Sequence, residues 1–294
     1  MPLRRTDLPR HHACSQTLTP MRSDTFHSID AQKAQTLEGQ LAAQNLACSV
    51  RWMEQTTSTN ADLLQRVRAG GGALSPQLLV VGHQTAGRGR QARVWQDAGN
   101  SLLTSLAWPF APGAAIAGLS VAVGVWLTQS LRGLGSPEAR LKWPNDVLLH
   151  GRKVAGVLVE LADTPQARWA VIGIGLNLRT PPGMPHATGL DAIGSNPPDR
   201  WEVLHKLAPA LLAGLPIFAQ SGLPPWIDAW NHLHAWAGQA VAVLDQGETR
   251  HTGIALGVDD SGCLLLETPQ GLRRVSSGDV SLRLAGAGAS LGSP

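Results

Sequence analysis

A glycine-spaced run that carries three arginines is the first candidate for chemistry in this chain. The run covers residues 82–95 and follows directly after the apolar segment Leu78–Val81. Glycine lets a backbone approach a ligand closely, and its N–H groups can point at an anion. The arginine fork matches phosphate and carboxylate oxygens in pairs. A strand that leads into such a loop indicates a site for a ligand bearing phosphate, carboxylate or both.

The same Arg-Gly-Arg pattern also occurs in disordered nucleic-acid-binding tails. The run alone does not separate the two interpretations. Apolar segments flank it on both sides and it does not repeat, which favours a binding loop in a folded domain.

Further polar clusters suit the transfer of a nucleotidyl group. The chain holds only four lysines against twenty arginines, and two of the four, Lys142 and Lys153, lie in polar motifs near the Asn145-Asp146 pair. Lysine is a compact point charge, whereas arginine is a fork. Transfer of phosphoryl or nucleotidyl groups requires mainly positioning and charge stabilisation. Cations between a carboxylate and an ATP α-phosphate remove their repulsion, so the inventory predicts activation of a carboxylate by adenylation.

Other common motifs are absent or weak. The chain has no G-x-x-x-x-G-K-[ST] loop and no G-x-S-x-G nucleophile motif. Gly173-Ile174-Gly175 lacks a third glycine at the dinucleotide spacing, so it predicts a close-packed strand. His232 and His234 lie beside tryptophans, and we expect them to be core or surface histidines rather than metal ligands.

Composition narrows the class of protein. The chain has 294 residues, 43% hydrophobic content and a net charge of +3, which allows anionic ligands without indicating a nucleic-acid binder. Three widely separated cysteines fit a reducing, cytoplasmic setting. No run of 18 apolar residues occurs, so no membrane span is expected. Residues 1 to about 29 show no signal-peptide pattern and are predicted to be a disordered tail.

Periodicity predicts alternating helices and strands up to about residue 237. Ser, Thr and Asn at 56–60 are typical of a helix start, although simple capping explains part of that signal. We expect one helix to be kinked or split by Pro209 and Pro216. The predicted helices are 29–45, 61–67, 116–134 and 201–218, and the predicted strands are 49–53, 78–81, 101–108, 147–149 hairpinned with 154–161, and 169–178.

From about Gly238 the pattern changes to short alternating runs separated by turn formers, which predicts a small β-barrel. The expected strands are 240–244, 249–258, 263–267 and 272–275. The fold class is therefore α+β, with a second all-β domain. The predicted division is a partly disordered tail with a possible helix at 1–44, a catalytic domain at 45–236, a C-terminal domain at 237–285 and a disordered tail at 286–294.

An ordered set of motifs resembles the biotin protein ligases. The set covers about residues 49–284: Ser58-Thr59-Asn60, Gln84-Thr85-Ala86-Gly87-Arg88-Gly89-Arg90, Lys142-Trp143-Pro144-Asn145-Asp146, Arg152-Lys153-Val154-Ala155-Gly156 with the apolar run to Glu160, Gly173-Ile174-Gly175-Leu176-Asn177, and Gly278-Asp279-Val280-Ser281-Leu282-Arg283. The motifs occur in the family's order and with similar gaps.

The resemblance implies a two-step reaction. Biotin's carboxylate attacks the ATP α-phosphate to give biotinyl-5′-AMP, and a lysine of a biotin carboxyl carrier protein, such as that of acetyl-CoA carboxylase, then takes the biotinyl group. Mg²⁺ is expected to arrive with ATP rather than at a site made of protein alone. The implied fold is a mixed-sheet catalytic domain related to class II aminoacyl-tRNA synthetases, followed by an SH3-like barrel.

The resemblance also assigns the site residues. Lys153 is the main catalytic cation, and Asp146 is also considered as a base for the incoming lysine. The implied catalytic residues are Lys153, Arg90, Arg88, Lys142 and Asp146. The implied biotin-binding residues are Ser58, Thr59, Asn60, Gln84, Arg88, Gly89, Arg90, Lys153 and Gly156, and the implied ATP-binding residues are Arg90, Arg93, Trp95, Asn145 and Asn177.

Two departures and two rivals bear on this assignment. Ala92 stands where the loop often has glycine. The residues before Ser58 show no helix-turn-helix pattern, so we expect a ligase without the DNA-binding domain of repressor members. Lipoate or octanoate ligation is the nearest rival. A DNA-binding regulator is disfavoured because acids and bases nearly balance in the N-terminal region.

Overall fold

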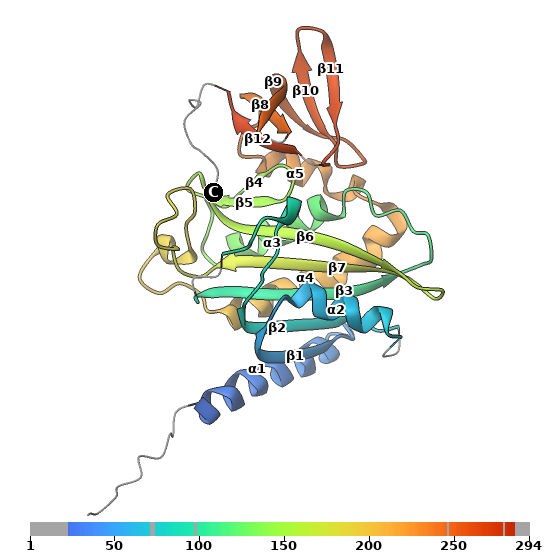
Figure 1. Cartoon of the computed structure of the whole chain (residues 1–294), viewed down its shortest axis with the longest axis vertical. Helices are drawn as coiled ribbons and strands as arrows, with labels where there is room; N and C mark the ends of the chain where they lie inside the picture. The colour runs from blue at the N-terminus through green and yellow to red at the C-terminus, as the bar shows by residue number, and fades with distance from the viewer. Residues whose placement is uncertain (1–22, 71–73, 97–98, 246, 279, 286–294) are drawn as a thin grey trace, which may run out of the picture.

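The computed structural model describes residues 23–70, 74–96, 99–245, 247–278 and 280–285. A seven-stranded sheet carries most of the chain, and a smaller five-stranded sheet formed by the C-terminal residues lies at one end of it (Figure 1). The expected α+β class with a separate all-β domain is confirmed.

The large sheet has the strand order β1-β2-β3-β7-β6-β5-β4. Strands β1 and β2 are parallel and every other neighbouring pair is antiparallel, so the sheet is mixed as predicted. The strands are β1 (Ser49–Thr56), β2 (Gln77–Gln84), β3 (Ser101–Phe110), β4 (Arg140–Lys142), β5 (Asp146–Leu149), β6 (Arg152–Asp163) and β7 (Arg168–Asn177).

Helices cover both faces of this sheet. Helix α2 (Thr59–Arg68) packs its buried Leu63, Leu64 and Val67 on one face. Helices α3 (Leu119–Gly133) and α4 (Arg200–Ser221) cover the other face. Helix α1 (Ser23–Ala43) lies along the edge strand β1, as Figure 1 shows. Short helix α5 (Ile227–Leu233) leads to the C-terminal domain.

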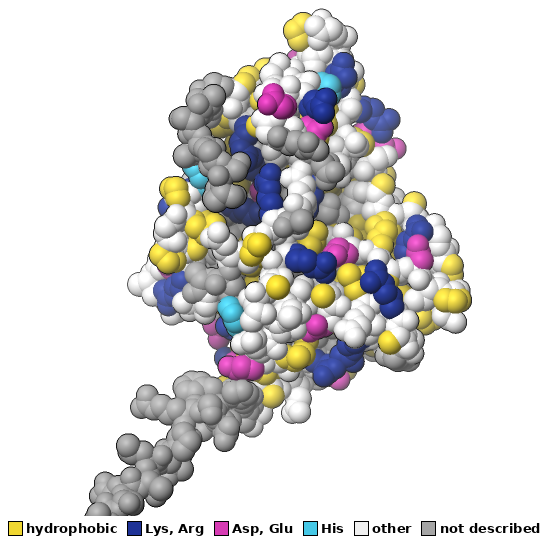
Figure 2. All heavy atoms as spheres, in the orientation of Figure 1, with side chains coloured by type: hydrophobic (Ala, Val, Ile, Leu, Met, Phe, Trp, Pro, Cys, Tyr) yellow, Lys and Arg dark blue, Asp and Glu magenta, His cyan; other side chains and the backbone are white. Residues whose placement is uncertain are grey.

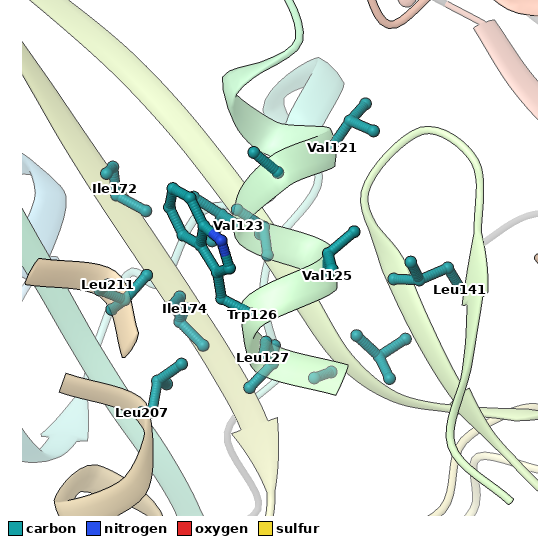
Figure 3. Close-up of a cluster of buried hydrophobic side chains, with 14 of the residues drawn as sticks. Val121, Val123, Val125, Trp126, Leu127, Leu141, Ile172, Ile174, Leu207 and Leu211 are labelled. Carbon is teal, nitrogen blue, oxygen red and sulfur yellow. The ribbon is translucent and has the colours of Figure 1, made fainter. Parts of the chain in front are cut away.

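The main core forms between the sheet and helices α3 and α4. Trp126 of α3 points toward Ile172 and Ile174 of β7 and lies near Leu207 and Leu211 of α4 (Figure 3). The α2 face instead buries Val171, which adjoins Ile172 on β7, and Leu103, which adjoins Leu102 on β3, because side chains on a strand alternate between its two faces. The residues that follow Leu103 and Val171 at intervals of two therefore face the α2 side.

The C-terminal domain is an antiparallel sheet of SH3-like type with the strand order β11-β10-β9-β8-β12. It shares the main core through Val241, Val258 and Leu264. The Trp143 indole N–H donates to the Gly262 carbonyl across the junction at 3.0 Å. Its strands are β8 (Ala240–Asp245), β9 (Glu248–Val258), β10 (Leu264–Thr268), β11 (Gly271–Val275) and β12 (Val280–Leu284).

Several expectations need correction. Helix α1 begins at Ser23, within the predicted disordered tail, and no Gly or Pro interrupts the chain from Ser23 to Ile29. Helix α4 is not split at Pro209 and Pro216, because its buried leucines hold it against the core. Elements β4, α5 and β12 were not predicted. The predicted disorder of residues 1–22 and 286–294 lies outside the described residues.

By length and composition alone, α4 could cross a membrane, but half of its most apolar window is buried inside the structure. Its N-terminus has a capping box in which Asp199 and Glu202 bond each other's backbone N–H groups. These features are those of a core helix of a folded domain.

His234 lies buried where the two domains meet. Its ring packs on Trp230 with 4.6 Å between centroids, and neither ring nitrogen has a hydrogen-bond partner among the described residues. Burial disfavours the charged imidazolium and lowers the pKa of His234 to about 4. The folded protein therefore keeps this side chain neutral at a pH where the unfolded chain already takes up a proton.

This pKa difference predicts an acid-dependent loss of stability. The folded pKa lies below the unfolded value of about 6.5, so the free energy of unfolding should fall as pH drops from about 6.5 toward 4. The limiting slope is about 1.4 kcal/mol per pH unit. Denaturant titrations of His234→Phe should show a shallower slope, while His232→Phe, an exposed neighbour, should match the wild type. An unchanged slope in His234→Phe would contradict the assignment.

Candidate active site

Three glycines leave part of the α2 face of the large sheet without side chains. Gly175 of β7 pairs with Gly156 of β6, and Gly173 pairs with Ser105 of β3. A Cβ at Gly173 would lie 2.4 Å from Asn60 Oδ1, and one at Gly175 would lie 2.6 Å from Trp95 Cε2. Real Cβ atoms do not approach other atoms so closely. The bare backbone therefore forms the floor of a trough, which we call the glycine floor (Gly156, Gly173 and Gly175).

A buried polar network closes one end of the trough. Helix α2 begins there, with Ser58 as its N-cap. The Thr59 N–H donates to Gln84 Oε1 at 2.7 Å, and Ser105 Oγ lies 2.6 Å from both Thr59 Oγ1 and Asn60 Oδ1. A carboxamide oxygen only accepts, so the Ser105 hydroxyl hydrogen goes to Asn60. The network fixes Thr59, Asn60 and Gln84 in one arrangement.

Glu160 of β6 connects this network to the arginine loop, by which we mean residues 85–95 after β2. Its Oε2 accepts from Asn60 Nδ2 at 2.8 Å and from Arg88 Nη2 at 3.4 Å. Asn60 Nδ2 also donates to the Leu158 carbonyl at 3.4 Å. Each polar side-chain atom of Asn60 is therefore engaged within the protein.

The arginine loop is tied to its surroundings mainly by backbone contacts. Thr85 and Ala86 donate to carbonyls at the end of β1, and Trp95 N–H donates to the Gly87 carbonyl at 2.9 Å. Arg90 Nη1 contacts Asn145 Oδ1 at 3.4 Å, and its Nη2 contacts the Ser277 and Gly278 carbonyls of the C-terminal domain. The loop thus spans from the sheet to the second domain.

Two lysines flank one aspartate at the other end of the trough. Lys153 Nζ lies 2.6 Å from Asp146 Oδ1, and Lys142 Nζ lies 3.5 Å from Oδ2. Burial opposes ionisation of Asp146, but Lys153 and Lys142 outweigh it and hold the pKa of this carboxyl below its usual value. Burial in turn lowers the pKa of Lys142, and Asp146 offsets part of that effect. Asp146 is therefore ionised at neutral pH.

The backbone fixes where Lys153 stands. Its N–H donates to the His186 carbonyl at 2.8 Å, and its carbonyl accepts from Thr188 N–H at 2.9 Å. The same segment binds Asn177, whose Nδ2 donates to the Thr188 carbonyl at 3.0 Å. The ammonium is thus presented next to Gly156, where a Cβ would lie 3.2 Å from Nζ.

The structure brings most of the predicted site residues to this trough. Arg93 is the exception, because its side chain is exposed and no described side-chain contact joins it to the others. Ser105 and Glu160 were missed by the sequence analysis. Their only sequence signal is polarity inside the apolar strands β3 and β6, which can equally mark a solvent-facing position.

The surroundings of the trough are open and basic. A cavity of about 460 Å³ adjoins it, lined by the end of β2, the loop residues Gly87, Val94 and Trp95, and Pro181, Pro182 and Met184. On the face shown in Figure 2, Lys and Arg side chains gather where the two domains meet. Together with the lysine–aspartate cluster, this arrangement suits a negatively charged ligand.

The mixed sheet, the polar trough and the paired lysines define a ligase-type domain, and comparisons with known proteins name its family. The description "Biotin/lipoate A/B protein ligase family" matches residues 48–177, and "Biotin protein ligase C terminal domain" matches residues 237–283. The bifunctional ligase/repressor BirA of Escherichia coli (strain K12) is 35% identical over 265 residues, which are 87% of this chain and 80% of BirA.

Two further relatives agree. The biotin–[acetyl-CoA-carboxylase] ligase of Mycobacterium tuberculosis is 36% identical over 77% of this chain and 86% of its own length. The solved biotin protein ligase from Aquifex aeolicus in complex with biotin and ATP has a TM-score of 0.69 at 28% identity, over 80% of this chain and 98% of that one. The chain belongs to the biotin protein ligase family.

The glycine floor gives a direct prediction. Gly173→Ala should push Asn60 aside and weaken biotin binding at least about 10-fold, or about 1.4 kcal/mol, as measured by isothermal titration calorimetry. Gly214→Ala is the matched control, because its Cβ would lie 2.4 Å from Trp126 in the distant core. The control should lower the melting temperature without changing biotin affinity. Wild-type affinity in Gly173→Ala would contradict this account of the floor.

Proposed function

We propose that this chain joins biotin and ATP as biotinyl-5′-AMP in the trough and passes the biotinyl group to a lysine of a biotin carboxyl carrier protein. The observation that carries this assignment is that the two ends of the glycine floor carry different chemical groups. Neutral hydrogen-bonding groups lie at the Thr59 end, and a held ammonium lies at the Lys153 end. Biotin has a neutral ureido ring at one end and a carboxylate at the other.

The Thr59 end suits the ureido ring. Its two N–H groups need acceptors and its carbonyl needs donors once it is buried. Ser58 and Thr59 offer hydroxyl oxygens. Gln84 Oε1 is taken by the Thr59 N–H, so its Nε2 is left as a donor. Asn60, whose own atoms are engaged, contributes by holding this arrangement in place.

Adenylation takes place at the Lys153 end. A carboxylate oxygen of biotin attacks the ATP α-phosphorus, an acyl–phosphate bond forms, and the bond to the leaving pyrophosphate breaks. Lys153 lies between the two anions, and Arg88, Gly89 and Arg90 cover them from the loop. These groups stabilise the charge that grows on the phosphate in the transition state.

Asp146 serves to hold Lys153 rather than to act as a base. Both of its oxygens are engaged by ammonium groups, and its pKa is lowered, which makes it a poor acceptor of a proton from the incoming lysine. Lys142 supports the same carboxylate from the buried side. In the transfer step the acceptor amine attacks the acyl carbon, an amide forms and AMP leaves.

ATP binding is assigned to Arg90, Arg93, Trp95, Asn145 and Asn177. In the part of the chain described, no three His, Cys, Asp or Glu side chains are grouped to hold a metal ion. Asn145 and Asn177 anchor their NH₂ groups on the Val157 and Thr188 carbonyls. The Asn177 oxygen would serve as a hard ligand that Mg²⁺ accepts beside phosphate, and the Asn145 oxygen would do so on release from Arg90. The ion supplies neutralisation of the triphosphate charge.

The proposed partners are the carrier protein, biotin and ATP, without nucleic acid or membrane. The described cysteines, Cys48 and Cys263, are free thiols, which supports a cytoplasmic setting. Burial raises the pKa of Cys48 to about 12, so that thiol is unreactive. We also propose the division into a catalytic domain at 45–236 and a C-terminal domain at 237–285.

Biotin-dependent exchange of labelled pyrophosphate into ATP tests the assignment. The wild type with Mg²⁺ should exchange with biotin and not with lipoate. Lys153→Ala should lose at least about 100-fold in rate, in the range seen when a transition-state donor is removed. Lys206→Ala, an exposed lysine on α4, is the matched control and should keep the wild-type rate.

Two results would overturn the proposal. Exchange with lipoate but not with biotin would show that the substrate is lipoate and not biotin. Normal exchange by Lys153→Ala would remove the central role of this lysine.

A further inference from the structure

We propose that the Trp95 indole occupies part of the biotin subsite in the unliganded enzyme, so that biotin must displace it to bind. The inference rests on the proposed placement of biotin between Thr59 and Lys153. It adds that this residue competes with the substrate and thereby sets the affinity for biotin.

The indole lies directly on the glycine floor. A Cβ at Gly175 would lie 2.6 Å from Trp95 Cε2 and 2.9 Å from Cδ2, the two atoms shared by the indole rings. A Cβ at Gly156 would lie 3.4 Å from Cζ3. The flat ring thus covers the bare backbone of β6 and β7 in the middle of the trough. A ligand that reaches from Thr59 to Lys153 would need this space.

The ring also contacts the cation that biotin's carboxylate would use. Lys153 Nζ lies 5.6 Å from the Trp95 ring centroid, within the range of a cation–π contact. The carboxylate and the α-phosphate offer this ammonium full negative charge. Substrates therefore replace a weaker partner of Lys153 with a stronger one.

The indole is not fully satisfied where it lies. Its Nε1 is buried and has no acceptor among the described residues. A buried N–H without a partner lost its hydrogen bond to water on entering the trough, and it regains one on leaving. The unpaired N–H makes the conformation with the indole in the trough less stable, so that a substrate can compete with it.

Trp95 differs in burial from the loop residues on either side of it. Arg93, Val94 and Gln96 are exposed, and Val94 shows 73% of its surface. Trp95 instead packs against the core cluster on the α2 face. The cavity of about 460 Å³ beside the trough offers space for the displaced ring. Once displaced, the indole becomes available for the adenine of ATP, which is its role in the proposed site.

The test measures biotin binding without ATP by calorimetry. Trp95→Ala should bind biotin at least about 5-fold more tightly than the wild type, because nothing has to be displaced. Trp226→Ala is the matched control: its ring is similarly half-buried but packs on Phe218 and Trp126. It should keep the wild-type dissociation constant. An equal or weaker affinity in a folded Trp95→Ala would overturn the inference.

A second measurement applies if Trp95→Ala does not fold. The full chain labelled with 5-fluorotryptophan gives one ¹⁹F resonance per tryptophan, and Trp95→Phe identifies the one from Trp95. Saturation with biotin alone should shift this resonance, and an unmoved resonance would overturn the inference. A wild type that binds no biotin would instead refute the proposed function, so the two failures are distinguishable.

Discussion

Side chains alternate between the faces of a β-strand, so glycines at 156, 173 and 175 empty one patch of two adjacent strands. The other parts of the site depend on that patch. Asn60 and Trp95 can lie against the sheet only because no Cβ stands there. Lys153 reaches over the same patch from one end, and Thr59 faces it from the other. A substitution that returned a side chain to the floor would displace groups on both sides of the substrate.

The position of the charged groups at the Lys153 end depends on a second interaction, the ion pairs that Asp146 forms with two lysines. A buried ammonium such as that of Lys142 is costly unless it has a partner, and Asp146 is the partner of both Lys142 and the more exposed Lys153. The carboxylate stays ionised because both lysines favour its charged form over the effect of burial. The cluster can therefore present one ammonium to an incoming anion while Lys142 keeps the aspartate in place. Arg90, which reaches the Ser277 and Gly278 carbonyls, couples the loop above this cluster to the C-terminal domain.

The sequence predicted features that depend on nearby residues. A helix start within the polar cluster 56–60 and the β5–β6 hairpin follow from capping and turn chemistry, and both are confirmed, with Ser58 as the N-cap of α2. Contacts between distant segments could not be predicted from the sequence. Ser105 and Glu160 are polar residues in apolar strands, and only the folded sheet brings them to Asn60. Strand β4 and helix α5 are too short to show a period. Helix α4 keeps Pro209 and Pro216 because packing outweighs local propensity.

The most direct test of the account is a crystal structure of this chain with biotin and a slowly hydrolysed ATP analogue. We predict that the ring system of biotin lies on the glycine floor, that its carboxylate lies within hydrogen-bond distance of Lys153 Nζ, and that the Trp95 indole has left Gly175. Biotin bound away from Gly173 and Gly175, with the indole still in place, would contradict the account.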